Sequence, residues 1–342
     1  MTRKRVTSFD VAKRAGVSRS VVSAVLNGTQ GIGVSPETRE AVLAAIKELN
    51  YHVDSQARAM RTGQSSCLAA FGDTGNPLFL QVLEGIQQAC LARRYHILIC
   101  GQEDGEARER LLELYLQNRI DGIITLDPVS YCDEKWAAEV NRLQVPYVSI
   151  EGYAENDSVI SVQADYYKSV MDALAYMSRD TALPPPIYVH LHNNENLASN
   201  WAEKRREQAY TDWCANRCVE PRIERLHADD EMGLRRVLQR LQAEGAGIPP
   251  LLFNWAMGAI GTYRAAWELD LRVGEHVKLM AADDTLRVNR YLVPSLSMME
   301  IPYAAMGAEA VAALFSQIDR GEPLERRESR FLQARLHPGE SI

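Results

Sequence analysis

The chain has 342 residues, of which 46% are hydrophobic and 24% are charged, and its formal net charge is −7. This size and composition indicate more than one globular domain and exclude a largely disordered protein. No apolar run approaches the roughly 18 residues of a membrane-spanning helix. The basic start, Met1–Arg5, leads into no apolar signal segment. We therefore expect a cytoplasmic protein with no membrane partner.

Charge is distributed unevenly along the chain. Residues 1–63 contain ten Lys and Arg against five Asp and Glu, a net charge of +5, which leaves −12 for the other residues. A basic head on an acidic body suits phosphate contacts made by the head alone. The cysteines form no CxxC motif and lie near no histidine pair, so we expect reduced thiols, no metal site and no cofactor. They are residues 67, 90, 100, 132, 214 and 218.

The segment from Phe9 to Gly28 predicts a helix-turn-helix. Apolar residues recur at helical spacing on both sides of Gly16, so two short helices share one small core across a tight turn. Ser18 is a good N-cap for the second helix. The opposite face of this helix is expected to point into a DNA groove, and it consists of Arg19, Ser20, Ser23 and Ala24.

A third helix and a linker complete the head. Ser35, Pro36 and Glu37 supply an N-cap, a first-position proline and an acidic first turn. The apolar side of this helix closes a three-helix core and consists of Val42, Ala45, Ile46 and Leu49. The polar residues that follow have too little helix propensity to hold a helix alone. We expect a DNA-binding domain over residues 1–51 and a linker over 52–64.

From Ser66 onward, strand and helix patterns alternate in two series. Predicted strands are Cys67–Phe71, His96–Cys100, Gly122–Leu126, Tyr147–Ile150, Ile187–Leu191, Leu251–Phe253 and Val277–Ala281. Alternation of this kind predicts an α/β core of two doubly wound parallel-sheet subdomains, with a ligand cleft at the carboxyl ends of the strands. We expect this core over residues 65–342, one subdomain near 65–162 and 292–322, and the other near 163–291 and 323–342.

Short segments at fixed spacing match one protein family. They are Asp10–Lys13, Ala15–Ser18, Val22–Gly28, Val34–Arg39, Ile46–Tyr51, Arg61–Gly63, Asn76–Phe79, Asp121–Ile124, Asp283–Asp284 and Pro294–Ser297. On these residues the chain resembles the lactose-repressor (LacI/GalR) family of bacterial transcription regulators. The resemblance implies an all-α helix-turn-helix head on a periplasmic-binding-protein-like core. It also implies a homodimer that binds a palindromic operator and a small-molecule effector, associated with the nucleoid when bound.

The resemblance assigns base reading to Arg19, Ser20 and Ala24. Arg19 has the geometry to donate two hydrogen bonds to guanine, and Ala24 to touch a thymine methyl group; a phosphate contact is the alternative for Arg19. Ser18 either binds phosphate or only caps its helix. The residues expected to bind phosphates are Arg3, Lys4, Arg5, Arg14, Ser18, Ser23 and Asn27.

The linker resembles the family's hinge helix, which pairs with its partner in the minor groove. Met60 occupies the position of the leucine that the family inserts between bases, and Ala57 lies on the same hinge. Methionine also serves as an apolar wedge. Val53 replaces the family's usual proline, so the start of the hinge is less rigid.

The effector residues are also implied by the resemblance. Arg206 looks like the effector-binding arginine, and Phe79, Asp165 and Asp283 match other positions of the pocket. Asp165 has the alternative role of a helix cap. Asn254 is retained, but the next residue, acidic in the family, is Trp255, which either fills the core or stacks on a ligand. His192 and Asn193, at a strand end, are further candidates, although a packed or solvated ring is the alternative for the histidine.

Replacement of an acid by tryptophan, together with Tyr166 in place of the family's asparagine, makes a typical free sugar a poor fit. A phosphorylated or carboxylated effector and a degenerate pocket both stay open. The sequence thus favours a repressor, with a ligand-independent or activating regulator as the alternative. A sugar-acting enzyme with a DNA-binding head is the remote alternative function, because no GxSxG, HExxH or phosphate-binding glycine motif occurs.

No heptad pattern follows the core, so we expect a dimer rather than a coiled-coil tetramer. Its interface is expected to include the helix after Asn76 and the helix over 106–118.

Overall fold

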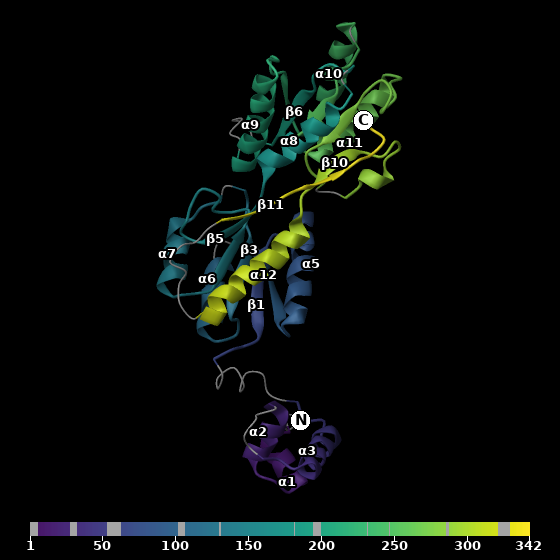
Figure 1. The fold of residues 1–342 in the computed structure, drawn as a ribbon. Coiled ribbons are helices and arrows are strands. Elements are labelled where there is room, and N and C mark those ends of the chain that lie inside the picture. The colour runs from purple at the N-terminus through teal and green to yellow at the C-terminus, as the bar shows by residue number, and fades with distance from the viewer. Residues whose placement is uncertain are drawn as a thin grey trace. The chain divides into compact units, whose positions relative to one another are not determined.

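A computed structural model describes residues 6–27, 33–52, 63–101, 107–129, 131–180, 182–193, 200–230, 232–245, 247–284, 287–320 and 329–342. The chain forms two compact units, Met1–Ser65 and Ser66–Ile342 (Figure 1). Within the described ranges, no helix combines the length and apolarity needed to cross a membrane.

The first unit contains the predicted three helices, α1 (Ser8–Ala15), α2 (Arg19–Asn27) and α3 (Pro36–Glu48). Gly16 ends α1 with φ +67°, a left-handed conformation that glycine adopts without strain. Ser35 caps α3 as predicted, since its hydroxyl accepts a hydrogen bond of 3.2 Å from the Thr38 amide. The helices share a core of Val11, Ala12, Val22, Val25, Val42 and Ala45. The helix-turn-helix prediction is therefore confirmed.

The second unit contains two six-stranded sheets. The first has the order β11-β5-β4-β3-β1-β2, and all of its pairs are parallel. Its strands are β1 (Cys67–Gly72), β2 (His96–Gly101), β3 (Gly122–Leu126), β4 (Tyr147–Ile150), β5 (Ile160–Ala164) and β11 (Arg330–Leu332).

The second sheet has the order β12-β10-β9-β8-β6-β7 and is parallel except where β12 joins β10. Its strands are β6 (Ile187–His192), β7 (Ile223–His227), β8 (Leu251–Phe253), β9 (Leu279–Ala281), β10 (Ser297–Glu300) and β12 (Arg335–His337). The predicted doubly wound parallel architecture is confirmed.

Helices cover both faces of each sheet (Figure 1). The first sheet packs against α5 (Pro77–Ala92) and α12 (Tyr303–Arg320) on one face, and α6 (Ala107–Leu116) and α7 (Glu134–Arg142) on the other. The second packs against α8 (Tyr166–Met177) and α9 (Trp201–Asn216), and on its other face α10 (Gly233–Ala243) and α11 (Ala256–Glu268). A short 3-10 helix, Asn289–Tyr291, precedes β10.

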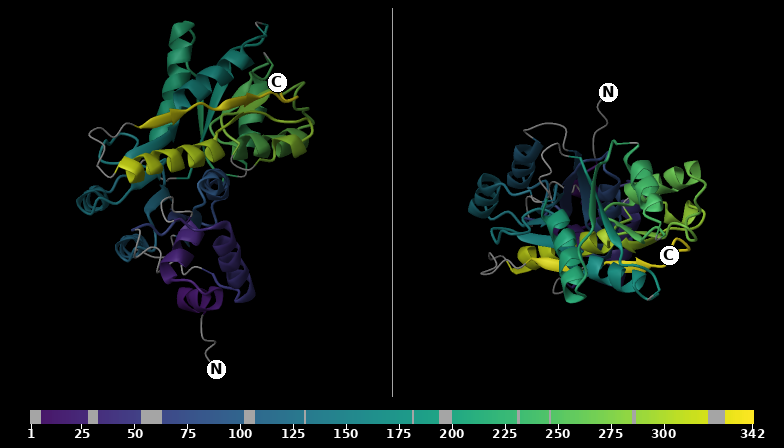
Figure 2. Two further views of the ribbon diagram at one scale, coloured as in Figure 1. Left: turned by 60° about the horizontal axis from the view of Figure 1, so that its bottom comes forward. Right: turned by 90° about the horizontal axis from the view of Figure 1, so that it is seen from above.

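The structure differs from the sequence prediction in its shorter strands. β5, β7, β10, β11 and β12, each of three to five residues, are absent from the predicted set. Strands this short give only a weak alternation signal, and other strands of the same length are nevertheless predicted. β10 also belongs to the second sheet and β11 to the first, the reverse of the expected subdomain boundaries. The physical reason is that the chain crosses between the sheets three times, after β5, β10 and β11 (Figure 2).

Candidate DNA-binding and effector sites

The second helix of the head exposes part of the predicted reading face. Arg19 and Ser20 are exposed and Ser23 is half-buried. Ala24 is only 3% exposed, so its expected position on the exposed face is wrong. Within the described residues of α2, the fully exposed polar side chains are therefore those of Arg19 and Ser20.

Two residues predicted to bind phosphate make contacts within the head. The Ser18 hydroxyl accepts a hydrogen bond of 3.4 Å from the Val21 amide, which is the capping role that the sequence left open. The Arg14 guanidinium forms an ion pair with Glu48, with 2.7 Å between Nη2 and Oε2, and joins α1 to α3. Both partners of this pair are more than half exposed, so its energetic contribution is small.

Several expected DNA contacts lie outside the described residues. These are Arg3, Lys4 and Arg5 in the basic arm and Ala57 and Met60 in the hinge. Asn27 ends α2, but its side chain is also outside the described part of the chain.

In the second unit, Arg206 lies in α9 and is only 5% exposed. Its Cζ atom lies 4.3 Å from the centre of the Tyr166 ring. Among the residues that the structure describes, none forms a hydrogen bond or an ion pair with the guanidinium, and its Nε atom is buried without a partner. Burial opposes the charged form, but Tyr166 and Asp283 outweigh burial and raise the pKa of Arg206 above its usual value.

Glu151 is a functional candidate that the sequence reasoning missed. It directly follows β4 and is 2% exposed. The Tyr166 hydroxyl donates a hydrogen bond of 2.6 Å to Oε1, whereas Oε2 is buried without a partner. Burial raises the pKa of Glu151 to about 7, against the opposing effects of the Tyr166 hydrogen bond and the Arg206 charge. The available signal was an acid at the carboxyl end of a predicted buried strand.

The Arg206 guanidinium, the Tyr166 ring and the Glu151 carboxyl group meet where the chain passes between the two sheets. Tyr166 begins α8 directly after β5, and Tyr303 begins α12 after β10. Burial and the charge of Glu151 raise the pKa of Tyr303, which is 7% exposed. The site therefore takes residues from both sheets. We call Glu151, Tyr166, Arg206, Asp283 and Tyr303 the Arg206 site.

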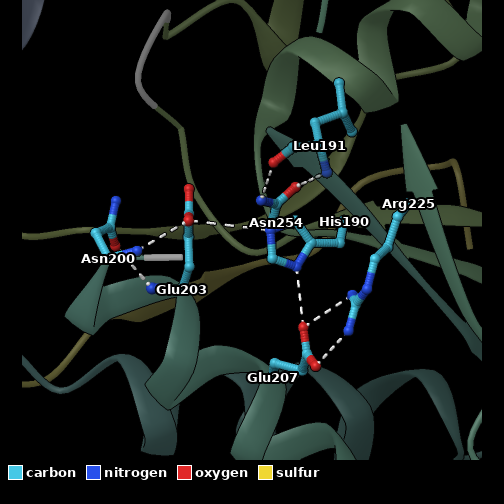
Figure 3. A network of polar contacts seen from close by, with 7 residues as sticks. All are labelled: His190, Leu191, Asn200, Glu203, Glu207, Arg225 and Asn254. Atoms are coloured by element: carbon cyan, nitrogen blue, oxygen red, sulfur yellow. Dashed lines mark hydrogen bonds and ion pairs between the residues drawn. The ribbon is translucent and has the colours of Figure 1, made fainter. Parts of the chain in front are cut away.

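Two other predicted effector residues hold backbone in place. Asn254 is fully buried; its Oδ1 accepts a hydrogen bond of 2.9 Å from the Leu191 amide, and its Nδ2 donates one of 2.8 Å to the Leu191 carbonyl (Figure 3). Asp283 accepts a hydrogen bond of 2.6 Å from the Ala256 amide at the start of α11. Both side chains thus fix the ends of strands of the second sheet.

Three further effector candidates make packing or capping contacts in the structure. Phe79 is 1% exposed and packs in the core of the first sheet. Asp165 caps α8 by accepting a hydrogen bond of 2.9 Å from the Lys168 amide. Trp255 is half-buried and packs against the core of the second sheet.

A network of charged groups holds α9 against β6 and β7 (Figure 3). His190 is 5% exposed, and its Nδ1 lies 3.0 Å from Oε2 of Glu207. Arg225 donates hydrogen bonds of 3.0 and 2.6 Å to the same carboxylate. Burial works to raise the pKa of Glu207, but the hydrogen bonds from Arg225 and His190 outweigh it and hold the pKa below its usual value.

The face of α9 that carries Glu207 also carries a second carboxylate, that of Glu203, four residues earlier in the chain. Glu203 is 5% exposed, and its Oε2 lies 3.9 Å from Nε2 of His190. It also forms a reciprocal cap with Asn200 at the start of α9 (Figure 3). Arg206 lies between Glu203 and Glu207 in sequence, so this network fixes the helix that carries the arginine.

His192 and Asn193 lie at the carboxyl end of β6. The His192 ring is half-buried and lies 5.4 Å from the His227 ring, edge to face, while Asn193 is exposed. Across the described ranges, no three His, Cys, Asp or Glu residues are arranged to hold a metal ion.

The fold and these sites define a class of protein: a helix-turn-helix DNA-binding regulator with a two-sheet, periplasmic-binding-protein-like core. Residues 9–54 match the family described as bacterial regulatory proteins, lacI family, and residues 187–342 match the periplasmic binding protein-like domain. The chain therefore carries a lacI-family DNA-binding domain followed by a periplasmic-binding-protein-like domain.

Relatives and solved structures agree with this assignment. The chain is 27% identical over 342 residues to the HTH-type transcriptional repressor PurR of Serratia proteamaculans, covering 97% of this chain and 94% of the relative. It is 25% identical over 317 residues to the sucrose operon repressor of Pediococcus pentosaceus, covering 91% of each. A structure of the Lac repressor bound to ONPG in the repressed state shares the fold, with a TM-score of 0.77, 22% identity and coverage of 99% and 100%.

Proposed function

We propose that this chain is a transcriptional repressor that binds a palindromic operator as a homodimer and responds to a small effector in a cleft between its two sheets. The observation that carries the proposal is the exposed start of α2, in a helix-turn-helix that matches the lacI family. The PurR and sucrose operon relatives are named as repressors, which supports repression rather than activation.

Base reading is assigned to Arg19 and Ser20, because both side chains are exposed at the start of α2. An arginine at this position has the geometry for a bidentate contact with guanine, which contributes roughly 1 to 3 kcal/mol of discrimination. Phosphate contacts and minor-groove insertion are assigned to the basic arm and the hinge as the sequence predicts.

Exposed leucines and isoleucines support a dimer through the first sheet. Leu80 and Leu91 of α5 are 61% and 67% exposed, Ile99 of the edge strand β2 is 55% exposed, and Leu116 of α6 is 59% exposed. Such a concentration of large apolar side chains on neighbouring elements is typical of an interaction surface. Another structure with the same fold is the Lac repressor dimer bound to operator and the anti-inducer ONPF, at 22% identity and a TM-score of 0.77.

The effector is assigned to the Arg206 site, with His192 and Asn193 at its edge. An unpaired buried cation and an unpaired buried carboxylate oxygen in one place favour a working site over a degenerate pocket, because buried polar groups are ordinarily satisfied. Phe79, Asn254 and Trp255 support this site from the surrounding core.

Selection of bound sites from random DNA tests the proposal. The wild type should yield a palindrome of two half-sites about one helical turn apart. Arg19→Ala should relax specificity at one position in each half-site. Arg264→Ala, which removes an exposed charge from α11, is the matched control and should leave the selected sequence unchanged. Uniform loss of affinity for all sequences with Arg19→Ala would make Arg19 a phosphate contact.

A further inference from the structure

Arg206 is a permanent cation that forms no ion pair with any residue the structure describes, although the charge of Asp283 acts on it. A guanidinium keeps its charge when buried, and its five N–H donors need acceptors. The Tyr166 ring covers one face of the group at 4.3 Å, but an aromatic face does not satisfy the N–H donors along its edge. Among the described residues, no oxygen accepts a hydrogen bond from its buried Nε atom. The buried Nε–H group of the guanidinium therefore lacks an acceptor among the described residues.

The neighbouring cations are already neutralised. Arg225 pairs with Glu207, and Lys168 pairs with Asp172 at 2.8 Å. The acids of the site are likewise engaged: Asp283 accepts from the Ala256 amide, and Oε1 of Glu151 accepts from Tyr166. What the site offers to a ligand is the donor edge of one guanidinium and one acceptor, Oε2 of Glu151.

We infer that the effector is a small hydroxycarboxylate, whose carboxylate pairs with Arg206 and whose hydroxyl group bonds to Oε2 of Glu151. This inference rests on the proposed function, which makes the Arg206 site the effector site. A carboxylate matches the planar fork of a guanidinium by two parallel hydrogen bonds. A hydroxyl fits Oε2 whether Glu151 is ionised or protonated, because it both donates and accepts.

The net charge of the ligand distinguishes a carboxylate from a phosphate as the group that pairs with Arg206. A phosphate monoester carries about −1.5 to −2 at neutral pH. Against a single unpaired cation, it would leave excess negative charge beside Glu151 and Asp283. A monoanion neutralises Arg206 without that excess. The site therefore selects a carboxylate over a phosphate of the same skeleton.

Ligand binding should be linked to proton uptake. Glu151, whose pKa is about 7, faces Tyr166 of α8, Arg206 of α9, Tyr303 of α12 and, farther off, Asp283. A bound carboxylate neutralises Arg206 and adds negative charge nearby, so it raises the pKa of Glu151 further. Affinity should then fall by about tenfold from pH 6 to pH 8, because the bound state retains a proton that the free state loses.

The test measures ligand binding by the full chain, using thermal shift and titration calorimetry. The probes are D-gluconate and D-glucuronate, their neutral counterparts D-glucitol and D-glucose, and glucose 6-phosphate. At least one carboxylate should bind about 100-fold more tightly than its neutral counterpart. Arg206→Gln should abolish this binding, and Arg206→Lys should weaken it while keeping the charge. Arg205→Gln is the matched control on the same helix, because Arg205 lies over Tyr167 and bonds to Gln208.

Glu151→Gln should bind the carboxylate with affinity that no longer changes between pH 6 and pH 8. Equal binding of a neutral counterpart, tighter binding of the phosphate, or no shift by either carboxylate would each overturn the inference. Operator binding, measured on the same preparation by fluorescence anisotropy, separates the two proposals. If operator binding persists while no carboxylate binds, only the ligand assignment fails; if operator binding is absent, the proposed function fails.

Discussion

At the scale of single residues, the site is governed by the cost of burying charge. Glu151 and Arg206 are both more than nine-tenths buried, yet they respond differently. A carboxyl group can become neutral by taking a proton, and the pKa of Glu151 accordingly rises to about 7. A guanidinium cannot lose its proton near neutral pH, so Arg206 keeps its charge.

Glu151→Gln should therefore change how stability depends on pH. The folded pKa of about 7 lies above the usual 4.5, so the folded state holds a proton that the unfolded state loses. The resulting stability is fully present below pH 4.5 and is lost as the pH rises through 7. In the wild type this should remove about 1 to 3 kcal/mol between pH 5 and pH 8. Urea unfolding at the two pH values should show this loss in the wild type and in the surface variant Glu139→Gln, but not in Glu151→Gln.

At the scale of elements, α9 is held by paired charges on the face that carries Arg206 (Figure 3). Glu207 joins β6 and β7 to the helix through His190 and Arg225, and Asn254 fixes the neighbouring strand ends. The site is thus positioned by contacts that do not touch its own polar atoms. Positioning of this kind is what keeps a binding group in a fixed geometry.

Glu207→Gln tests the role of this network. It removes the charge that pairs with Arg225 and His190, so the free energy of unfolding should fall by about 1 kcal/mol. Hydrogen exchange should quicken at the amides of α9 before other helices respond. The exposed acid Glu220 provides the control substitution, Glu220→Gln. Unchanged exchange in α9 would show that packing alone positions the helix.

The contact between α5 and α12 is a second element-scale feature. A Cβ atom on Gly85 would lie 1.7 Å from the Ala304 carbonyl oxygen, and one on Gly307 would lie 2.2 Å from that of Val82. The backbones of the two helices therefore touch.

Gly85→Ala should force the helices apart and destabilise the second unit by about 3 kcal/mol or more. Gly75→Ala is the control in the same unit, because a methyl group there meets only the Asp73 side chain, at 3.3 Å. Chemical unfolding followed by tryptophan fluorescence, which reports the second unit because all five tryptophans lie in it, checks this difference. An effect for Gly85→Ala no larger than that of the control would contradict the close packing.

At the scale of the whole molecule, the proposed recognition of a palindromic operator depends on the proposed dimer of the core. One head of about fifty residues makes few base contacts, so a dimer is needed for high specificity.

Leu80→Glu combined with Leu91→Glu should convert the dimer to a monomer, because charge would be buried in the proposed interface. Analytical ultracentrifugation measures the change, with the half-exposed head leucine variant Leu43→Glu as control. A monomeric wild type, or a dimer unaffected by the double substitution, would refute the interface.

Prediction from sequence succeeded where a local pattern carried the information. The caps at Ser18 and Ser35, the turn at Gly16 and the alternation of strand and helix each depend on neighbouring residues. It failed for short strands and for Ala24, whose exposure depends on the size of surrounding groups. It missed Glu151 because nothing local distinguishes a buried acid from the many acids on the surface.

The sequence by itself determined the two kinds of domain, the reading helix and the arginine that the family resemblance marks. The domains and the reading helix follow from periodicity, capping and spacing, which are local properties of the chain, whereas the arginine follows only from the resemblance. Only the tertiary structure decided that Arg206 is buried, with its Nε atom lacking a partner among the described residues, and that Glu151 and Tyr303 lie with it. Their meeting depends on three crossings between two sheets, and the electrostatics of the site follow from the burial that those crossings create.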